Sequence, residues 1–191
     1  MRIHVKSQVP IASGLASSAA LEVAFATLLN EAFKLKYKQR DLAEIAYEAE
    51  NAELGIPCGR LDQYGSAFGG IIKLDCKFPY RVEKLPSRNL TFVILNSGIK
   101  HSTAEIHPIR QKEISEGLKA LMECDKLPDK TKRKLGYRFD EPEWEKISEE
   151  EIEEYLNLLQ DDVADRIRFT LRMQKSTEIC LLYTSPSPRD S

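Results

Sequence analysis

A loop of small residues directly before a long apolar stretch most constrains how this chain can fold. The loop runs from Pro10 to Ser18 and follows Ile3–Val9, which alternates apolar and polar residues as a half-buried strand does. Gly14 permits backbone geometries that are closed to other residues. The free N–H groups of the next helix and the positive end of its dipole face the loop, so the junction predicts a phosphate site.

The same junction has a second interpretation, since small residues between a strand and a helix can serve close packing alone. The loop lacks the Gly-Lys-Ser/Thr of a Walker motif and is not a GxGxxG fingerprint. Neither of these two familiar nucleotide-binding folds is therefore predicted. The serines of the loop are expected to cap the helix that follows.

The rest of the first half predicts alternating helices and strands. Residues 18–34 are apolar on most faces, which indicates a helix buried within a domain. Asp41 and Glu44 read as a capping pair that opens a second helix, which ends near Leu54–Gly55. A turn follows at Gly55–Gly59, and residues 67–74 are typical of a strand pair or a bulged strand.

The second half predicts one buried strand and then helices. Leu90–Leu95 is a continuous apolar run, as in a strand that is buried on both faces. Residues 102–122 and 163–179 are predicted to be helical. The charged stretch 125–154, broken by two prolines, predicts short surface helices.

Charge and composition exclude several classes of partner. The net charge is −2 with acids and bases interspersed, so no nucleic-acid partner is expected. The chain has no apolar run long enough for a membrane span and no signal peptide at its start, which predicts a cytoplasmic protein without a membrane partner. The four cysteines are scattered, which favours free thiols over a zinc site or disulfides.

The last residues differ in kind from the rest of the chain. Cys180–Asp190 resembles a sequencing adapter translated in one frame, so residues 180–191 are expected not to be native and are left out of the fold prediction.

Two carboxylates around a Gly/Pro turn form a second constellation. Glu50, on the second predicted helix, can reach a magnesium ion held between phosphates, and Asp62, beyond the turn, can accept or orient a hydroxyl proton. Each also has an ordinary interpretation. Glu50 can be one of several exposed helix glutamates, and Asp62 can be a turn or cap residue.

Three ordered motifs together resemble the GHMP kinases, and within that family the galactokinase group. Pro10–Ala20 is similar to the family's phosphate loop. Ala49-Glu50, followed by Gly55-Ile56-Pro57-Cys58-Gly59-Arg60-Leu61-Asp62-Gln63, resembles the segment with a Cys-Gly pair shortly before the catalytic Asp-Gln. Asn96–Ser102 resembles the segment that links a strand and a helix at the start of the second half.

The resemblance implies an α+β fold with two domains and ATP between them. Residues 1–88 would form an N-terminal domain like the second domain of ribosomal protein S5, and residues 89–179 an incomplete ferredoxin-like domain. It also implies phosphoryl transfer from Mg-ATP to the anomeric hydroxyl of galactose or a related sugar.

The resemblance further implies roles for particular residues. Asp62 would be catalytic, Ser18 and Glu50 would bind Mg²⁺, and Gly59, Asp62 and His107 would contact the sugar. The residues implied to hold the ATP phosphates are Pro10, Ser13, Gly14, Leu15, Ala16, Ser17, Ser18 and Ala19.

Departures from the family pattern leave other functions open. His107 stands where a sugar-contacting Tyr is common, and it also fits a surface histidine near a helix start. Ala16 replaces the usual Gly or Ser. An early Gly-Glu-His-Thr-Asp run and a late glycine-rich motif are absent, so this chain alone is expected to be inactive. The alternatives are a mevalonate-type kinase, a non-catalytic regulator that binds sugar and ATP, and a plain structural domain; the sugar and the oligomeric state stay open.

Overall fold

The computed structural model describes residues 2–86, 93–95 and 103–184, and these form two compact units. The first unit is Met1–Ile106 and the second is His107–Ser191. The predicted strand Leu90–Leu95 lies mostly outside the described residues, and the motif Asn96–Ser102 lies entirely outside them; Val93–Leu95 has no regular structure.

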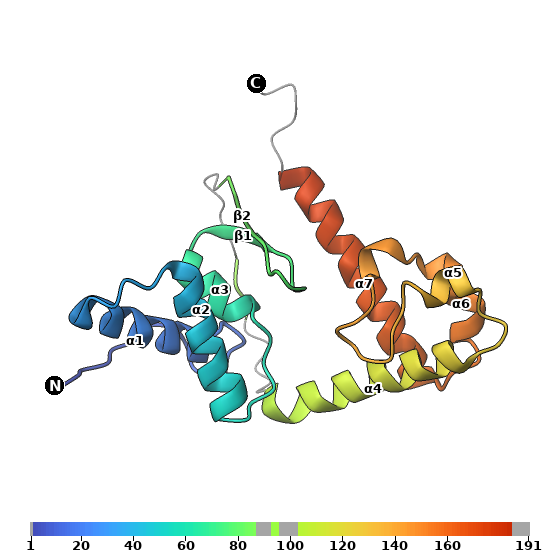
Figure 1. The fold of residues 1–191 in the computed structure, drawn as a ribbon, viewed down its shortest axis with the longest axis horizontal. Coiled ribbons are helices and arrows are strands. Elements are labelled where there is room, and N and C mark those ends of the chain that lie inside the picture. Colours follow the sequence, from blue (N-terminus) through green and yellow to red (C-terminus); the bar gives the residue numbers. More distant parts are fainter. Residues whose placement is uncertain (1, 87–92, 96–102, 185–191) are drawn as a thin grey trace, which may run out of the picture. The chain divides into compact units, whose positions relative to one another are not determined.

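Three helices and a hairpin make up the described part of the first unit (Figure 1). Helices α1, α2 and α3 pack on one another, and α3 also contacts β1. The elements are α1 Ser17–Phe33, α2 Gln39–Glu48, the π-helical turn η1 Ala49–Glu53, α3 Leu61–Phe68, β1 Ile71–Leu74 and β2 Val82–Leu85.

Helix α2 begins two residues earlier than the sequence predicts. Asp41 is its third residue, and the Asp41 carboxylate accepts the backbone N–H of Lys38 at 2.8 Å. That contact satisfies one of the free donors at the helix start. The helix buries Leu42, Ala43 and Ala46 on one face, as its apolar stripe predicts.

The hairpin corrects the strand pair predicted over residues 67–74. Ala67 and Phe68 close α3 instead, and the chain then turns through Gly69 and Gly70, where φ is +63° and +69°. Strand β1 pairs antiparallel with β2, with Ile71 opposite Leu85 and Leu74 opposite Val82. The second strand of the pair thus lies further along the chain than predicted.

Two other predictions for this unit are wrong. Residues 3–9 form no strand, because within the described residues no second segment provides a ladder for them. Helix α1 is found where it was predicted, but it is buried on one face only. Ala19 and Val23 are buried against the unit, whereas Leu21 and Phe25 are 50% and 44% exposed.

The described part of the second unit is helical. The predicted helices are present, and the last one is longer than expected at its C-terminal end. Leucine and isoleucine side chains from these helices and from the loops between them form one buried cluster, with Ile152, Leu156 and Ile167 fully buried. The stretch 125–154 thus contributes to the core and is not confined to the surface as predicted. The elements are α4 Thr103–Glu123, α5 Asp129–Lys132, the 3₁₀ turn η2 Trp144–Lys146, α6 Glu149–Leu156 and α7 Asp161–Thr184.

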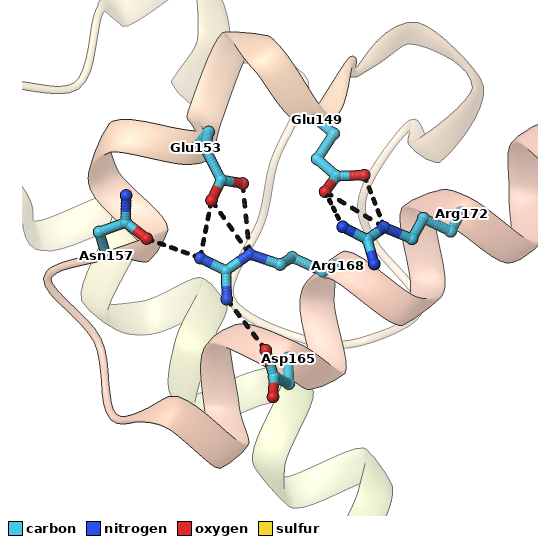
Figure 2. Close-up of polar contacts among 6 residues, drawn as sticks. All are labelled: Glu149, Glu153, Asn157, Asp165, Arg168 and Arg172. Atoms are coloured by element: carbon cyan, nitrogen blue, oxygen red, sulfur yellow. Dashed lines mark hydrogen bonds and ion pairs between the residues drawn. The ribbon is translucent and has the colours of Figure 1, made fainter.

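Two arginines on α7 form ion pairs and hydrogen bonds with side chains of α6 and its C-terminal end (Figure 2). Arg168 binds the Glu153 carboxylate at 2.9 Å and the Asn157 side-chain oxygen at 2.7 Å, and Arg172 binds Glu149 at 2.9 Å. Arg168 also bonds Asp165 on its own helix at 3.0 Å. These polar contacts lie over an apolar interior, which is the usual division between surface and core.

The described elements, helices with a small antiparallel sheet, fit the predicted α+β class. The S5-like and ferredoxin-like assignments stay predictions, as do the boundaries at 88/89 and 179/180. Over the three described ranges, no helix has both the length and the apolar character that crossing a membrane requires.

Candidate phosphate and sugar site

The loop before α1 alternates the sign of its backbone φ. Ala12, Gly14 and Ala16 have φ of +56°, +74° and +54°, whereas Ser13 and Leu15 are not among the residues with positive φ. Alternation of this kind turns successive N–H groups toward one concave side, which is a common way to bind an anion. The loop therefore has a φ alternation that is typical of anion-binding backbone concavities.

The N-terminus of α1 carries no side-chain cap. Its N-cap residue is Ala16, and its first turn holds no acidic residue. The prediction that the loop serines cap this helix is wrong, because Ser13 donates its hydroxyl to the Pro10 carbonyl at 2.8 Å instead. The first-turn N–H groups and the dipole of α1 are thus not neutralised by a protein side chain.

Glu50 is a buried residue, unlike the exposed glutamates beside it. It lies in η1, and its side chain is 7% exposed, while Glu48 and Glu53 are exposed. The Gln63 side-chain amide donates to Glu50 Oε2 at 2.6 Å. This burial rules out the interpretation of Glu50 as an ordinary solvent-facing glutamate. Single π-helical turns are frequent at functional sites.

Glu22, which sequence reasoning missed, and Gln63, which it named only as part of a motif, complete the surroundings of Glu50. Burial raises the pKa of Glu22 above its usual value, the charge of Glu50 raises it further, and a hydrogen bond from Gln63 opposes both effects. Gln63 Oε1 and Glu22 Oε2 are buried and have no hydrogen-bond partner. The spacing of Glu22 four residues after Ser18, one helical turn, is the signal that could have found it.

Cys58 lies in the loop between η1 and α3, which Asn51 holds in place. The Asn51 side-chain amide donates to the Cys58 carbonyl at 3.1 Å. Burial, followed by the charge of Glu50, raises the pKa of the Cys58 thiol to about 11. A thiol that stays protonated at neutral pH is a poor nucleophile.

Asp62 is exposed in the first turn of α3, directly after the loop that contains Gly59. The N-cap residue of α3 is Arg60, and no side chain caps the helix. Asp62 is therefore not the cap residue that the alternative interpretation made it.

Arg60 anchors the start of α3, a role that sequence reasoning missed. Its guanidinium lies 3.7 Å from the centre of the Tyr47 ring and 4.1 Å from that of Tyr80. Arg60 Nε also pairs with Glu44 Oε2 at 3.0 Å, and the Tyr64 hydroxyl donates to Glu44 Oε1. Stacking and ion pairing together fix the backbone two residues before Asp62.

The donor set around Glu50 fits a magnesium ion. Mg²⁺ is usually held by one or two carboxylates together with substrate phosphates and water. The two partnerless acceptors, Gln63 Oε1 and Glu22 Oε2, leave this cluster with an excess of oxygen acceptors, which favours a cation nearby. In the part of the chain that the structure describes, no three His, Cys, Asp or Glu side chains converge into a metal site by themselves.

His107 lies in α4, where its side chain is exposed. It belongs to the second unit, whereas the loop, Glu50 and Asp62 belong to the first. The sugar contact predicted for His107 stays a prediction.

Comparison with known proteins gives this geometry a family. The family described as GHMP kinases N terminal domain matches residues 1–70, which contain the loop, Glu50 and Asp62. The chain belongs to the GHMP kinases.

Its relatives within that family are galactokinases. The chain is 38% identical over 152 residues to the galactokinase of Thermococcus kodakarensis. The aligned region covers 72% of this chain and 43% of that protein. It is 39% identical over 127 residues to that of Thermotoga petrophila, covering 63% and 36% respectively. For the galactokinase of Clostridium acetobutylicum the identity is 31% over 160 residues, covering 81% and 38%. The chain thus spans less than half the length of these relatives, and no solved structure matches it.

Proposed function

We propose that this chain is part of an ATP-dependent sugar kinase. The reaction is transfer of the γ-phosphoryl group from Mg-ATP to the anomeric hydroxyl of galactose or a related sugar. One observation carries the proposal: the loop from Ala12 to Ala16 alternates its φ and leads into the uncapped N-terminus of α1. The galactokinase relatives support the choice of a sugar as acceptor.

The loop is the proposed phosphate site. Its backbone N–H groups and those of the first turn of α1 bind the phosphate oxygens, and short side chains let the phosphates approach the main chain. Gly14 serves by its conformation, because a Cβ there would meet nothing within 4 Å. The proposed contacts are Pro10, Ser13, Gly14, Leu15, Ala16, Ser17, Ser18 and Ala19.

Ser18 and Glu50 are the proposed ligands of Mg²⁺. The ion, when bound with ATP, neutralises the charge that develops on the transferred phosphoryl group. Glu50 contributes a carboxylate already oriented by Gln63. Ser18 contributes a hydroxyl from the first turn of α1.

Asp62 is the proposed catalytic residue. As an exposed carboxylate it accepts a proton from the sugar hydroxyl or fixes the orientation of that hydroxyl for in-line attack. Gly59 leaves room for the sugar beside the loop, and His107 is proposed as a further sugar contact. The proposed protein acts in the cytoplasm and has no nucleic-acid or membrane partner.

The test is a chimera in which this chain replaces the matched segment of the Thermococcus kodakarensis galactokinase. We expect it to phosphorylate at least one sugar of a panel with Mg-ATP. Asp62→Asn lowers turnover about 10²-fold to 10⁴-fold, the usual contribution of a positioned acid or base. Asp75→Asn, at an exposed position in the β1–β2 hairpin, is the matched control and leaves turnover unchanged.

Two outcomes would overturn the proposal. The first is a folded chimera that phosphorylates none of the sugars. If it nevertheless binds ATP and sugar by calorimetry, the non-catalytic regulator is the better description. The second is a chimera whose turnover is the same with Asp62→Asn as without it, which would remove Asp62 from the chemistry.

A further inference from the structure

The Gln63 side-chain amide lies between two carboxylates that come from different elements. Gln63 is fully buried, and its Nε2 donates to Glu50 Oε2 at 2.6 Å. Glu22 on α1 also lies near this side chain, since its interaction with Gln63 lowers the pKa of the Glu22 carboxyl against the effect of burial. Gln63 Nε2 is 3.9 Å from Cys58 Sγ. One amide from α3 thus lies between carboxyl groups of α1 and η1.

Glu22 determines whether the N–H end or the oxygen end of the Gln63 amide faces the carboxylates. A primary amide presents two N–H donors at one end and an acceptor oxygen at the other. With the amide reversed, Gln63 Oε1 would face two carboxylates in a buried setting, where unpaired acceptors are costly. The second carboxylate, Glu22, therefore keeps the donor end toward Glu50.

The bridge also connects the two proposed magnesium ligands. Glu22 follows Ser18 by four residues on α1, so both lie on the same face of that helix. From Glu22 the bridge runs through Gln63 to Glu50. This chain of contacts links the helix that carries Ser18 to Glu50.

We propose that Glu22 and Gln63 are positioning residues, which hold the Glu50 carboxylate in one orientation and fix its place relative to α1 for a divalent cation. The identity of the cation and its nucleotide rests on the proposed function. The contacts among Glu22, Gln63 and Glu50 do not depend on that function. Two experiments separate these parts.

The first experiment examines the bridge without metal, by NMR on the whole chain with EDTA present. We expect the side-chain amide protons of Gln63, assigned by their loss in Gln63→Met, to exchange slowly with water. Glu22→Gln removes the charge that orients the amide and speeds this exchange, while Glu48→Gln, at an exposed position of α2, does not. Exchange in the wild type as fast as that of an exposed glutamine would overturn the bridge.

The second experiment measures binding of Mn²⁺ in the presence of ATP by electron paramagnetic resonance. Gln63→Met leaves Glu50 without its donor and weakens Mn²⁺ binding about 10-fold to 100-fold, as loss of an outer-sphere partner does. Glu22→Gln weakens it in the same direction by a smaller factor, and Glu48→Gln leaves it unchanged. Binding of ATP in EDTA stays within about twofold in all three variants, because the phosphate loop is intact.

Each outcome decides a different part. Loss of metal-free ATP binding together with Mn²⁺ binding, in Glu22→Gln as well as Gln63→Met, would show a merely structural role and overturn the proposal. Unchanged Mn²⁺ affinity in both variants would overturn it also. A wild-type chain that binds no Mn²⁺ with ATP, but whose Gln63 amide exchanges slowly, would overturn the proposed function and support the bridge.

Discussion

The two units differ in the polar side chains that they bury. In the second unit a cluster of leucines and isoleucines is buried and arginine–carboxylate pairs lie over it. In the first unit Glu50 and Gln63 are buried, whereas Leu21 and Ile11 are 50% and 85% exposed. Both units bury apolar side chains, but the first also buries a carboxylate and its amide partner.

This difference separates stability from function. Burying a carboxylate costs free energy unless it is hydrogen-bonded, and two partnerless acceptors beside it add to that cost. An apolar core has no such cost. Violations of the usual arrangement are expected at functional sites, and here they gather around Glu50, in the unit that carries the family match.

The largest expected effect is in the apolar core of the second unit. Leu156→Ala removes a fully buried side chain and lowers the free energy of unfolding by about 2–5 kcal/mol. Fluorescence of Trp144, the single tryptophan, follows the denaturant unfolding of this unit because it packs against the core. Leu158→Ala, at a position 69% exposed, is the control and costs less than about 1 kcal/mol. Equal losses in the two variants would contradict the description of this core.

A smaller effect is expected from the arginine that anchors α3. Arg60→Ala removes a half-buried ion pair and two ring contacts, and we expect a loss of about 2 kcal/mol in the first unit. Hydrogen exchange of the α3 amides measures it. Arg138→Ala removes an exposed ion pair in the second unit, with both side chains more than 40% exposed, and costs less than about 0.5 kcal/mol. If Arg138→Ala costs as much, the contrast between a stacked and an open arginine fails.

The sequence predicted the helices better than it predicted their surroundings. Helical periodicity is local, so α1, α2, α4 and α7 fall close to the predicted ranges. The strand expected at Ile3–Val9 needs a partner strand, which a local pattern cannot predict. Which face of α1 is exposed depends on the segments that pack against the helix, and these too lie far away in the sequence. The partner of β1 was missed because pairing depends on the turn between the strands.

In the candidate site, too, local features could be found from the sequence and long-range contacts could not. The loop could be singled out as a candidate phosphate site because its small residues are consecutive, and Glu50 and Asp62 as candidates because they flank a distinctive turn. Glu22 and Gln63 could not, since their meeting depends on how α1, η1 and α3 pack. Nor could the anchoring of Arg60, which requires the β1–β2 hairpin to bring Tyr80 over it.

Acid should weaken the second unit through its ion pairs. Hydrogen bonds from Lys134 and Thr131 hold the pKa of Glu151 below its usual value. Its stabilising contribution is therefore present above the unfolded-state pKa of about 4.3 and is lost as pH falls through the lower folded-state pKa. We expect Glu151→Gln to cost up to about 1 kcal/mol at pH 7 and to reduce the loss of stability on acidification, followed by Trp144 fluorescence. A variant with the wild-type pH dependence would exclude Glu151 as a source of it.

The smallest expected effect tests the apolar surface of the first unit. Ile11 lies in the phosphate loop with 85% of its side chain exposed, so Ile11→Ser should change stability by no more than about 0.5 kcal/mol. Hydrogen exchange of the α1 amides measures this change in stability. By contrast, Leu127→Ser, at a buried position of the second unit, should cause a large loss of stability in that unit. A loss above about 1 kcal/mol for Ile11→Ser would mean that the loop packs inward in solution. The N–H groups of the loop would then be turned toward protein rather than toward a phosphate, and the contrast between the two units would reduce to their buried polar residues.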